Sequence, residues 1–132
     1  MDKYVGFNGR DDVAVLFNVG TGPQYSYNDP NPFKVADDFP TEDEILFAYY
    51  VDENYSGDAF VLFEKNGKLF EVHGSHCSCY GLEDQWHPEE TSWEALAIRP
   101  RTGYDSPTYC VIEQYSDTFW SLVDSHTHKE NI

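Results

Sequence analysis

Hydrophobic and polar residues alternate most clearly in the middle of the chain. Residues 44–52 (EILFAYYVD) are apolar or aromatic at both alternating sets of positions, which predicts a central strand covered on both sides. Two further apolar runs, 58–65 and 68–73, flank Asn66-Gly67, which favours a two-residue hairpin turn because both positions accept positive φ. The pairs across this turn are then Lys65 with Lys68, Phe63 with Phe70, and Val61 with Val72. We expect the face that carries these Phe and Val residues to form the core.

Helical periodicity dominates the last third of the chain. Residues 91–94 (TSWE) fit a capping box at the start of a short helix. Pro107, after a possible Ser cap, suits the start of a longer helix, whose apolar residues keep helical spacing to about Ser125. Residues 126–132 are expected to fray. The residues of the long helix expected to be buried include Ile112 and Phe119.

The first 40 residues are less regular. Residues 12–19 (DVAVLFNV) predict a strand, residues 3–7 predict a second one, and the Gly- and Pro-containing stretch 20–32 predicts a loop. The predicted fold is therefore a single α+β domain over residues 1–132. In this fold an antiparallel sheet, with a central hairpin at residues 58–73, packs against one long C-terminal helix and one short helix.

The composition adds a strong negative charge to this domain. The 132 residues include 24 acidic and eight basic side chains, for a formal net charge of −16 at pH 7, and 17% are aromatic. This charge disfavours direct binding to nucleic acid or to an anionic membrane. The aromatic content is typical of a folded chain. Because no apolar run reaches the roughly 20 residues of a membrane helix and no signal peptide is recognisable, we expect a cytoplasmic protein.

The negative charge is concentrated between residues 35 and 64, which contain nine acidic and no basic side chains. Carboxylates spaced over a folded surface can imitate the phosphates of a nucleic-acid backbone, and tyrosines add rigid contact area. We therefore expect this surface to bind a basic site on a partner protein. The acidic residues expected in the interface are Asp37, Asp38, Glu42, Asp43, Glu44, Asp52 and Glu53, and the tyrosines are Tyr25, Tyr27 and Tyr55.

One short stretch carries groups that bind metals or act in catalysis, namely His73, His76, Cys77 and Cys79, followed by His87. Thiolates and imidazoles are the ligands that zinc prefers, but a C-x-C spacing differs from the usual C-x2–4-C zinc knuckle. The Cys and His residues also match no known nucleophile signature. We expect no cofactor and no catalytic residue, and interpret the stretch as part of a loop that folds back on the sheet. The side chains expected to anchor that loop are Tyr80, Leu82 and Trp86.

The middle of the chain, YSGDAFVLFEKNGKLFEVHGSHCSCYGLEDQW, resembles small acidic proteins encoded by phages and prophages. The resemblance covers residues 44–96, and GSHCSCYGLEDQW is its most specific part. It implies no activity, cofactor or catalytic residue. It does imply a setting, which is the cytoplasm of an infected bacterium, where such accessory proteins often bind and block host machinery.

The charge and the resemblance together lead to the expected function. We expect a non-enzymatic inhibitor of the phage type with an anti-defence or host-takeover role. Its acidic surface would bind a basic host protein that handles nucleic acid, in the manner of a nucleic-acid mimic. One alternative is a protein that sequesters a small nucleotide signal in an aromatic pocket. Another is a small Cys/His protein that binds zinc through Cys77, Cys79 and one or two of His73, His76 and His87. A third is a small enzyme that uses Cys77 or Cys79 together with His73, His76 and Glu83.

Overall fold

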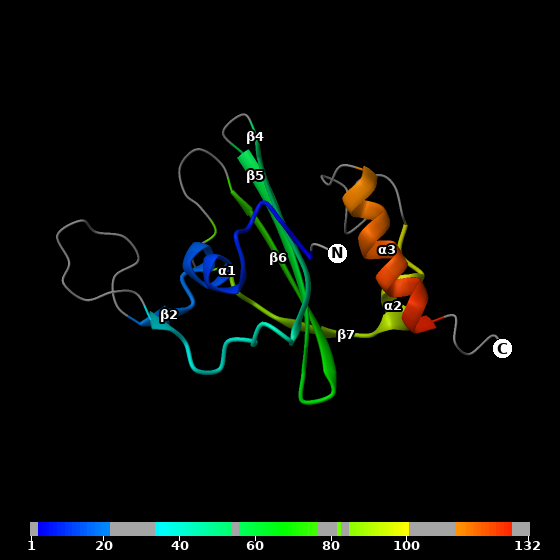
Figure 1. Ribbon diagram of the computed structural model, residues 1–132, viewed down its shortest axis with the longest axis horizontal. Coiled ribbons are helices and arrows are strands. Elements are labelled where there is room, and N and C mark those ends of the chain that lie inside the picture. Colours follow the sequence, from blue (N-terminus) through cyan, green and yellow to red (C-terminus); the bar gives the residue numbers. More distant parts are fainter. Residues whose placement is uncertain are drawn as a thin grey trace.

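A five-stranded sheet in the order β1–β4–β5–β6–β7 lies at the centre of the computed structural model (Figure 1). The residues that the structure describes are 3–21, 34–53, 56–76, 82, 85–100 and 113–127. The strands of the sheet are β1 (Tyr4–Val5), β4 (Ile45–Glu53), β5 (Ser56–Lys65), β6 (Lys68–His76) and β7 (Glu89–Thr91). A separate antiparallel pair consists of β2 (Gly20–Thr21) and β3 (Lys34–Val35). The helices are α1 (Arg10–Phe17), α2 (Trp93–Ala97) and α3 (Glu113–Thr127).

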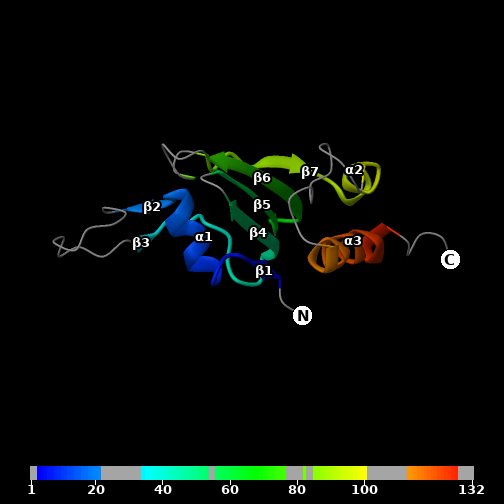
Figure 2. The ribbon, with the colours of Figure 1, turned by 90° about the horizontal axis from the view of Figure 1, so that it is seen from above.

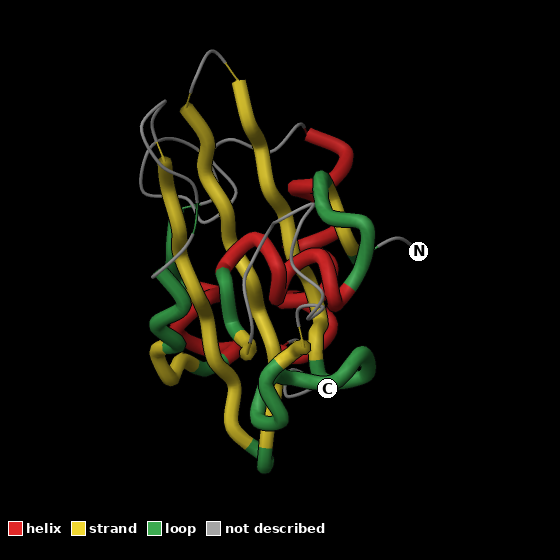
Figure 3. Tube along the Cα trace, turned by 90° about the vertical axis from the view of Figure 1, so that its left-hand side faces the viewer, coloured by secondary structure: helices red, strands yellow, loops and turns green. Residues whose placement is uncertain are grey.

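β5 and β6 form the hairpin that Asn66-Gly67 predicts. Both turn residues have positive φ, 56° for Asn66 and 76° for Gly67, as a tight two-residue turn requires. The register pairs Phe63 with Phe70, as expected. β4 pairs antiparallel to β5, so the three long strands lie side by side (Figure 3). The three strands predicted for the middle of the chain are therefore confirmed.

The sheet is mixed, which corrects the expectation of a purely antiparallel one. β1 runs parallel to β4, with Tyr4 opposite Ala48. Just after β1, Gly6 (φ 81°) passes so close to the next strand that a Cβ there would lie 2.0 Å from the carbonyl oxygen of Tyr50. Only glycine permits this approach. Alternation in residues 3–7 predicts a strand, but its parallel partner is distant in the sequence and leaves no local signal.

Residues 10–17 form helix α1, whereas the apolar run predicted a strand at residues 12–19, so that prediction is wrong. The helix begins with acidic residues in its first turn, which favour its N-terminus, and ends at Asn18 in a left-handed conformation. Its inner side chains are all buried, and these are Val13, Ala14 and Phe17. Burial of this face against the sheet outweighs the strand preference of the Val and Phe residues.

Apolar side chains are buried on both faces of the sheet, not on one. α1 lies on one side of the sheet and α2 and α3 lie on the other (Figure 2). One core lies on the side of α1 and includes Phe17, Val61, Phe63 and Val72. The opposite core lies on the side of α2 and α3 and includes Phe47, Phe60, Leu62, Leu96 and Phe119. The long C-terminal helix thus covers the face opposite to the one expected to form the core. Phe63 and Phe119 are buried as predicted, Phe70 is half-buried, and Ile112 lies outside the described residues.

α3 extends to Thr127, beyond the predicted end of the long helix. The ring of His126 stacks on Trp93 of α2, with 4.0 Å between the centroids and 10° between the planes. This contact gives the last turn a tertiary partner, so the expectation of fraying is wrong for the first two residues of the tail. The predicted start near Pro107 and the last five residues of the chain lie outside the described residues.

In the described part of the segment after β6, two of the expected anchors, Leu82 and Trp86, pack on the sheet. Leu82 is buried, and the ring of Trp86 lies parallel to Phe63 at a centroid distance of 5.7 Å and packs edge-on against Phe17 at 5.2 Å. The third expected anchor, Tyr80, lies outside the described residues. The segment then forms β7, a short strand that the sequence pattern does not predict.

Ser92, rather than Thr91, is the N-cap of α2, and because Ala95 at the N3 position has no side-chain acceptor, the expected capping box of Thr91 and Glu94 does not form. The side-chain oxygen of Ser92 accepts the backbone N–H of Ala95 at 3.0 Å. Ser92→Ala is therefore expected to lower the free energy of unfolding by about 1 kcal/mol, and Ser92→Gly by only a few tenths, because glycine is tolerated at an N-cap. Urea denaturation measures both. Equal losses for the two variants would contradict this assignment.

Candidate functional site

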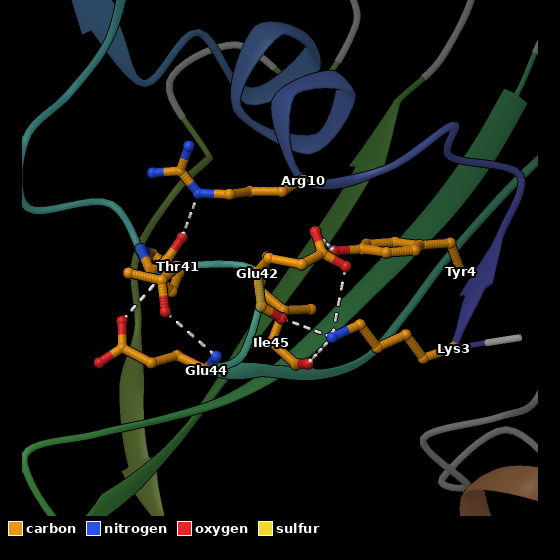
Figure 4. Close-up of polar contacts among 8 residues, drawn as sticks. Lys3, Tyr4, Arg10, Thr41, Glu42, Glu44 and Ile45 are labelled. Atoms are coloured by element: carbon orange, nitrogen blue, oxygen red, sulfur yellow. Dashed lines mark hydrogen bonds and ion pairs between the residues drawn. The ribbon is translucent and has the colours of Figure 1, made fainter. Parts of the chain in front are cut away.

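A network of side chains fixes the connection that leads into β4 (Figure 4). Lys3 donates from Nζ to the carbonyl oxygens of Glu42 and Ile45, the latter at 2.8 Å, and its Nζ lies 3.5 Å from the Glu42 carboxylate. The Tyr4 hydroxyl donates to the other oxygen of that carboxylate at 2.8 Å. Burial, the hydrogen bond and the charge of Glu42 together raise the pKa of Tyr4. Tyr4 is therefore a neutral donor that holds Glu42 in place.

The turn before β4 is closed by a reciprocal pair of hydrogen bonds. The Thr41 N–H donates to Glu44 Oε1 at 2.8 Å, and the Glu44 N–H donates to Thr41 Oγ1 at 3.3 Å (Figure 4). This is the bonding pattern of a capping box, and here it closes a single turn. The carboxylate of Glu44 is thus directed to the backbone of its own turn.

Arg10, the first residue of α1, ties the helix to the same connection. Its Nε donates to the carbonyl oxygen of Pro40 at 2.6 Å, and its guanidinium lies over the ring of Phe39, 5.3 Å from the centroid. Its Nη1 lies 3.2 Å from a carboxylate oxygen of Asp11. These contacts bring the N-terminus of α1 against residues 39–42, which are distant in the sequence.

A hollow of about 480 Å³ lies between the N-terminus of α1 and the turn before β4. It is lined by Asn8, Gly9, Arg10, Asp11, Asp12 and Glu42. The Asp12 carboxylate accepts the backbone N–H of Asn8 at 2.9 Å, which fixes its position. Three carboxylates and one guanidinium line this hollow, so its charge is negative.

Three further carboxylates, those of Asp37, Asp38 and Asp43, project from the connection between β3 and β4 and are exposed. Within the described ranges, no side chain or N–H pairs with them. Lys65 donates to the backbone oxygen of Asp38 and not to its carboxylate. Among the described residues, these three carboxylates therefore make no ion pair. We refer to the residues around the hollow and in this connection as the acidic surface, which comprises Asp11, Asp12, Asp37, Asp38, Glu42 and Asp43.

The structure brings together one part of the expected interface and separates it from another. Four of the predicted residues belong to the acidic surface, while Glu44 is engaged in its own turn. Asp52 and Glu53 end β4, about 25 Å from its start at the usual rise of a strand. The side chains of these two residues lie outside the described part, as do the three tyrosines Tyr25, Tyr27 and Tyr55.

Sequence reasoning missed the contribution of α1, namely Asp11 and Asp12, and the residues that position Glu42. Two local signals were present. Acidic residues before an apolar run are typical of a first helical turn, and the spacing of Thr41 and Glu44 is that of a capping box. No local signal identifies Lys3 as a partner of Glu42, because their contact depends on the parallel pairing of β1 with β4.

Only part of the Cys/His stretch lies in the described part of the chain. His73 is half-exposed and paired with a carboxylate, and His87 is exposed. The side chain of His76 and all of Cys77 and Cys79 lie outside the described residues. Among the residues that are described, no group of three His, Cys, Asp or Glu side chains is placed to hold a metal ion.

The carboxylate that pairs with His73 belongs to Glu71, which is only 4% exposed. Arg99, just after α2, binds both of its oxygens, at 2.6 and 2.7 Å, and His73 Nε2 lies 2.6 Å from one of them. Burial by itself raises the pKa of Glu71, but hydrogen bonds from His73, Arg99 and Thr91 outweigh it and lower the pKa to about 2. This carboxylate, which is hydrogen-bonded through both of its oxygens, joins the end of α2 to strands β6 and β7 of the sheet.

No protein-family model, curated protein or solved structure matches this chain. In the described part of the chain, no helix is long and apolar enough to cross a membrane. The acidic surface is the feature of the described residues that combines a hollow, fixed polar groups and charges without local partners.

Proposed function

We propose that the protein is a non-enzymatic accessory protein of the phage type whose acidic surface binds a basic site on a host protein. One observation carries the proposal: the fold brings Asp11 and Asp12 of α1 to the same hollow as Glu42. Three further exposed carboxylates, those of Asp37, Asp38 and Asp43, lie in the connection that contains Glu42. The formal net charge of −16 extends the same field over the molecule and attracts a basic partner from a distance.

The cations near this surface offset only part of its negative charge. Lys3 and Arg10 each make one ion pair with a carboxylate there, but both also donate to backbone carbonyl oxygens, and Lys65 does so as well. They thus act mainly to hold the chain. Asp37, Asp38 and Asp43 are left to pair with groups from another molecule, and the hollow between α1 and Glu42 has room for a basic side chain.

We propose further that the partner handles nucleic acid in the cytoplasm of a bacterial host. A groove built to bind phosphates presents Lys and Arg side chains at intervals, and carboxylates held on short, hydrogen-bonded turns can occupy it. The resemblance of residues 44–96 to phage-encoded proteins is the basis for placing the partner in the host, where the role would be anti-defence or host takeover.

Replacing Asp37, Asp38 and Asp43 by asparagine in one variant is expected to weaken partner binding about tenfold or more. A tenfold loss of affinity corresponds to roughly 1.4 kcal/mol of binding free energy, which is the combined contribution expected from the three lost charge pairs. The matched control neutralises Glu89, Glu90 and Glu94 with glutamine. These three residues are also exposed but lie in β7 and α2, so both variants lose the same charge. The measurement is capture from host lysate, followed by affinity measurement with the purified partner.

Three results together would support the proposal. The aspartate variant loses the partner while the glutamate variant keeps it, binding weakens steeply as salt rises, and duplex DNA competes for the partner. Undiminished capture by the aspartate variant would contradict the proposal. Equal losses for both variants would contradict it too, because net charge and not this surface would then be responsible. Salt-independent recovery of a bound nucleotide instead of a protein would favour the sequestering alternative.

A further inference from the structure

Among the described residues, a strand pairs with the outer edge of β6 over only part of its length. β7 pairs with Leu69, Phe70 and Glu71, whereas β6 continues to His76. Backbone N–H and C=O groups along an uncovered edge pair readily with a strand from another molecule. In the described part of the chain, the edge beyond Glu71 therefore depends on something other than a strand.

A side-chain amide takes the place of a strand at Ser75. The Ser75 N–H donates to Gln85 Oε1 at 2.8 Å, and Gln85 Nε2 donates to the Ser75 carbonyl oxygen at 2.7 Å. A residue directly opposite on an antiparallel strand makes the same two bonds with its own N–H and C=O. The primary amide of Gln85 thus imitates a peptide group.

The position of Gln85 follows from the register of the sheet. Leu69 lies opposite Thr91 and Glu71 lies opposite Glu89. If the same antiparallel register continues for four more residues, residue 85 lies opposite Ser75. Because β7 begins only at Glu89, the backbone at residue 85 does not make the ladder bonds, and the Gln85 side chain makes them instead.

The neighbours of Gln85 hold this amide in place. Leu82 is 2% exposed and packs so tightly against Gly74 that a Cβ there would lie 3.0 Å from it. The ring of Trp86 lies against Phe63 in the core on the α1 side. The packed residues before and after Gln85 therefore hold its backbone in place. Because it is already ordered, its side chain loses little conformational entropy when it bonds to the edge of β6.

We infer that Gln85 closes the edge of β6 against pairing with a second copy of the chain. A second copy fits because two such edges, related by a twofold axis, run antiparallel and present the same backbone groups to each other. The net charge of −16 on each copy opposes their approach, and salt screens that repulsion. The Gln85 amide therefore prevents strand pairing at all salt concentrations, whereas repulsion between the two negatively charged copies prevents it only at low salt.

Gln85→Ala is the test, with Gln85→Glu as its matched control. The alanine variant loses both bonds and is expected to self-associate, more strongly at high salt than at low salt. The glutamate variant also loses the Nε2 donor but places a negative charge at the edge, which resists strand pairing, so it is expected to stay monomeric. Sedimentation velocity at several salt concentrations measures the association of each variant.

Hydrogen exchange tests the inference in the unmodified protein as well, which keeps it testable if a variant fails to fold. The Ser75 amide is expected to exchange at least about tenfold more slowly than an unbonded edge amide, because it exchanges only when the Gln85 bond opens. Adding Ser75→Pro to Gln85→Ala removes the edge donor and is expected to restore the monomer, since proline is tolerated on a sheet edge.

Four results would overturn the inference. These are a monomeric Gln85→Ala at all salt concentrations, equal association of the alanine and glutamate variants, association that persists in the double variant, and an unprotected Ser75 amide in the unmodified protein.

Discussion

Replacing Phe63 by alanine is expected to lower the free energy of unfolding by about 3–5 kcal/mol. The side chain is 3% exposed and lies between two parallel rings, Phe70 at 5.3 Å and Trp86 at 5.7 Å between centroids. Its removal leaves a cavity that the two large rings cannot fill without losing their other contacts. The free-energy cost of the lost apolar burial and the cost of the cavity therefore add. Urea denaturation, with the slope checked for constancy, measures the change.

Phe70→Ala provides the comparison for this variant. Phe70 is the cross-strand partner of Phe63 and has the same side chain, but it is half-buried. Its loss is expected to cost clearly less, since burial decides the cost at fixed chemistry. A smaller effect for Phe63→Ala than for Phe70→Ala would show that the core on the α1 side is not packed as described.

Replacing Glu71 by alanine is expected to cost a similar amount, about 3–5 kcal/mol, because it leaves Arg99 without its buried partner. Arg99 makes two short bonds to this carboxylate, and its own side chain is 31% exposed. The double variant Glu71→Met with Arg99→Met is expected to recover much of the loss, since an apolar pair leaves no uncompensated charge. No recovery would indicate that packing around Glu71, and not its charge, is responsible.

The same carboxylate makes stability depend on pH. Its pKa is lowered from an ordinary value of 4.5 to about 2 in the folded protein, so the unfolded chain binds its proton first as pH falls. The stabilisation is complete above about pH 5 and is lost as pH falls toward 2, by about 3 kcal/mol. In Glu71→Gln this part of the pH dependence is expected to disappear, whereas a variant of exposed Glu64 is expected to keep it. Unfolding curves from pH 7 to 2 distinguish them.

Local pattern was sufficient for the middle of the chain and for the exposed acids. The Asn66-Gly67 turn and the runs on either side of it specify the hairpin and its register, because a two-residue turn leaves one way to pair the flanking strands. The apolar character of residues 44–52 at both alternating positions indicated a strand covered on both sides, which holds for β4. Acidic side chains without nearby bases were expected at the surface, where Asp37, Asp38 and Asp43 lie.

Two of the errors share one physical cause, which is competition between local conformational preference and burial. Residues 12–19 contain Val and Phe and prefer a strand in isolation, but a helix buries Val13, Ala14 and Phe17 together on one side. The sequence around the last turn of α3 only weakly favours a helix, but the ring of His126 in that turn stacks on Trp93 of α2. In both cases a partner distant in the sequence decides the conformation.

Sequence alone was enough to predict the strongly negative charge, the three long strands, the register of the β5–β6 hairpin, and the existence of two helices toward the C-terminus. These properties depend on composition or on residues a few positions apart. The tertiary structure alone decided that β1 pairs in parallel with β4, that α1 and α3 cover opposite faces, that Asp11 joins Glu42 around one hollow, and that Gln85 meets Ser75. Each of these contacts joins segments whose proximity depends on how the whole sheet assembles, and neither partner carries a local signal for the other.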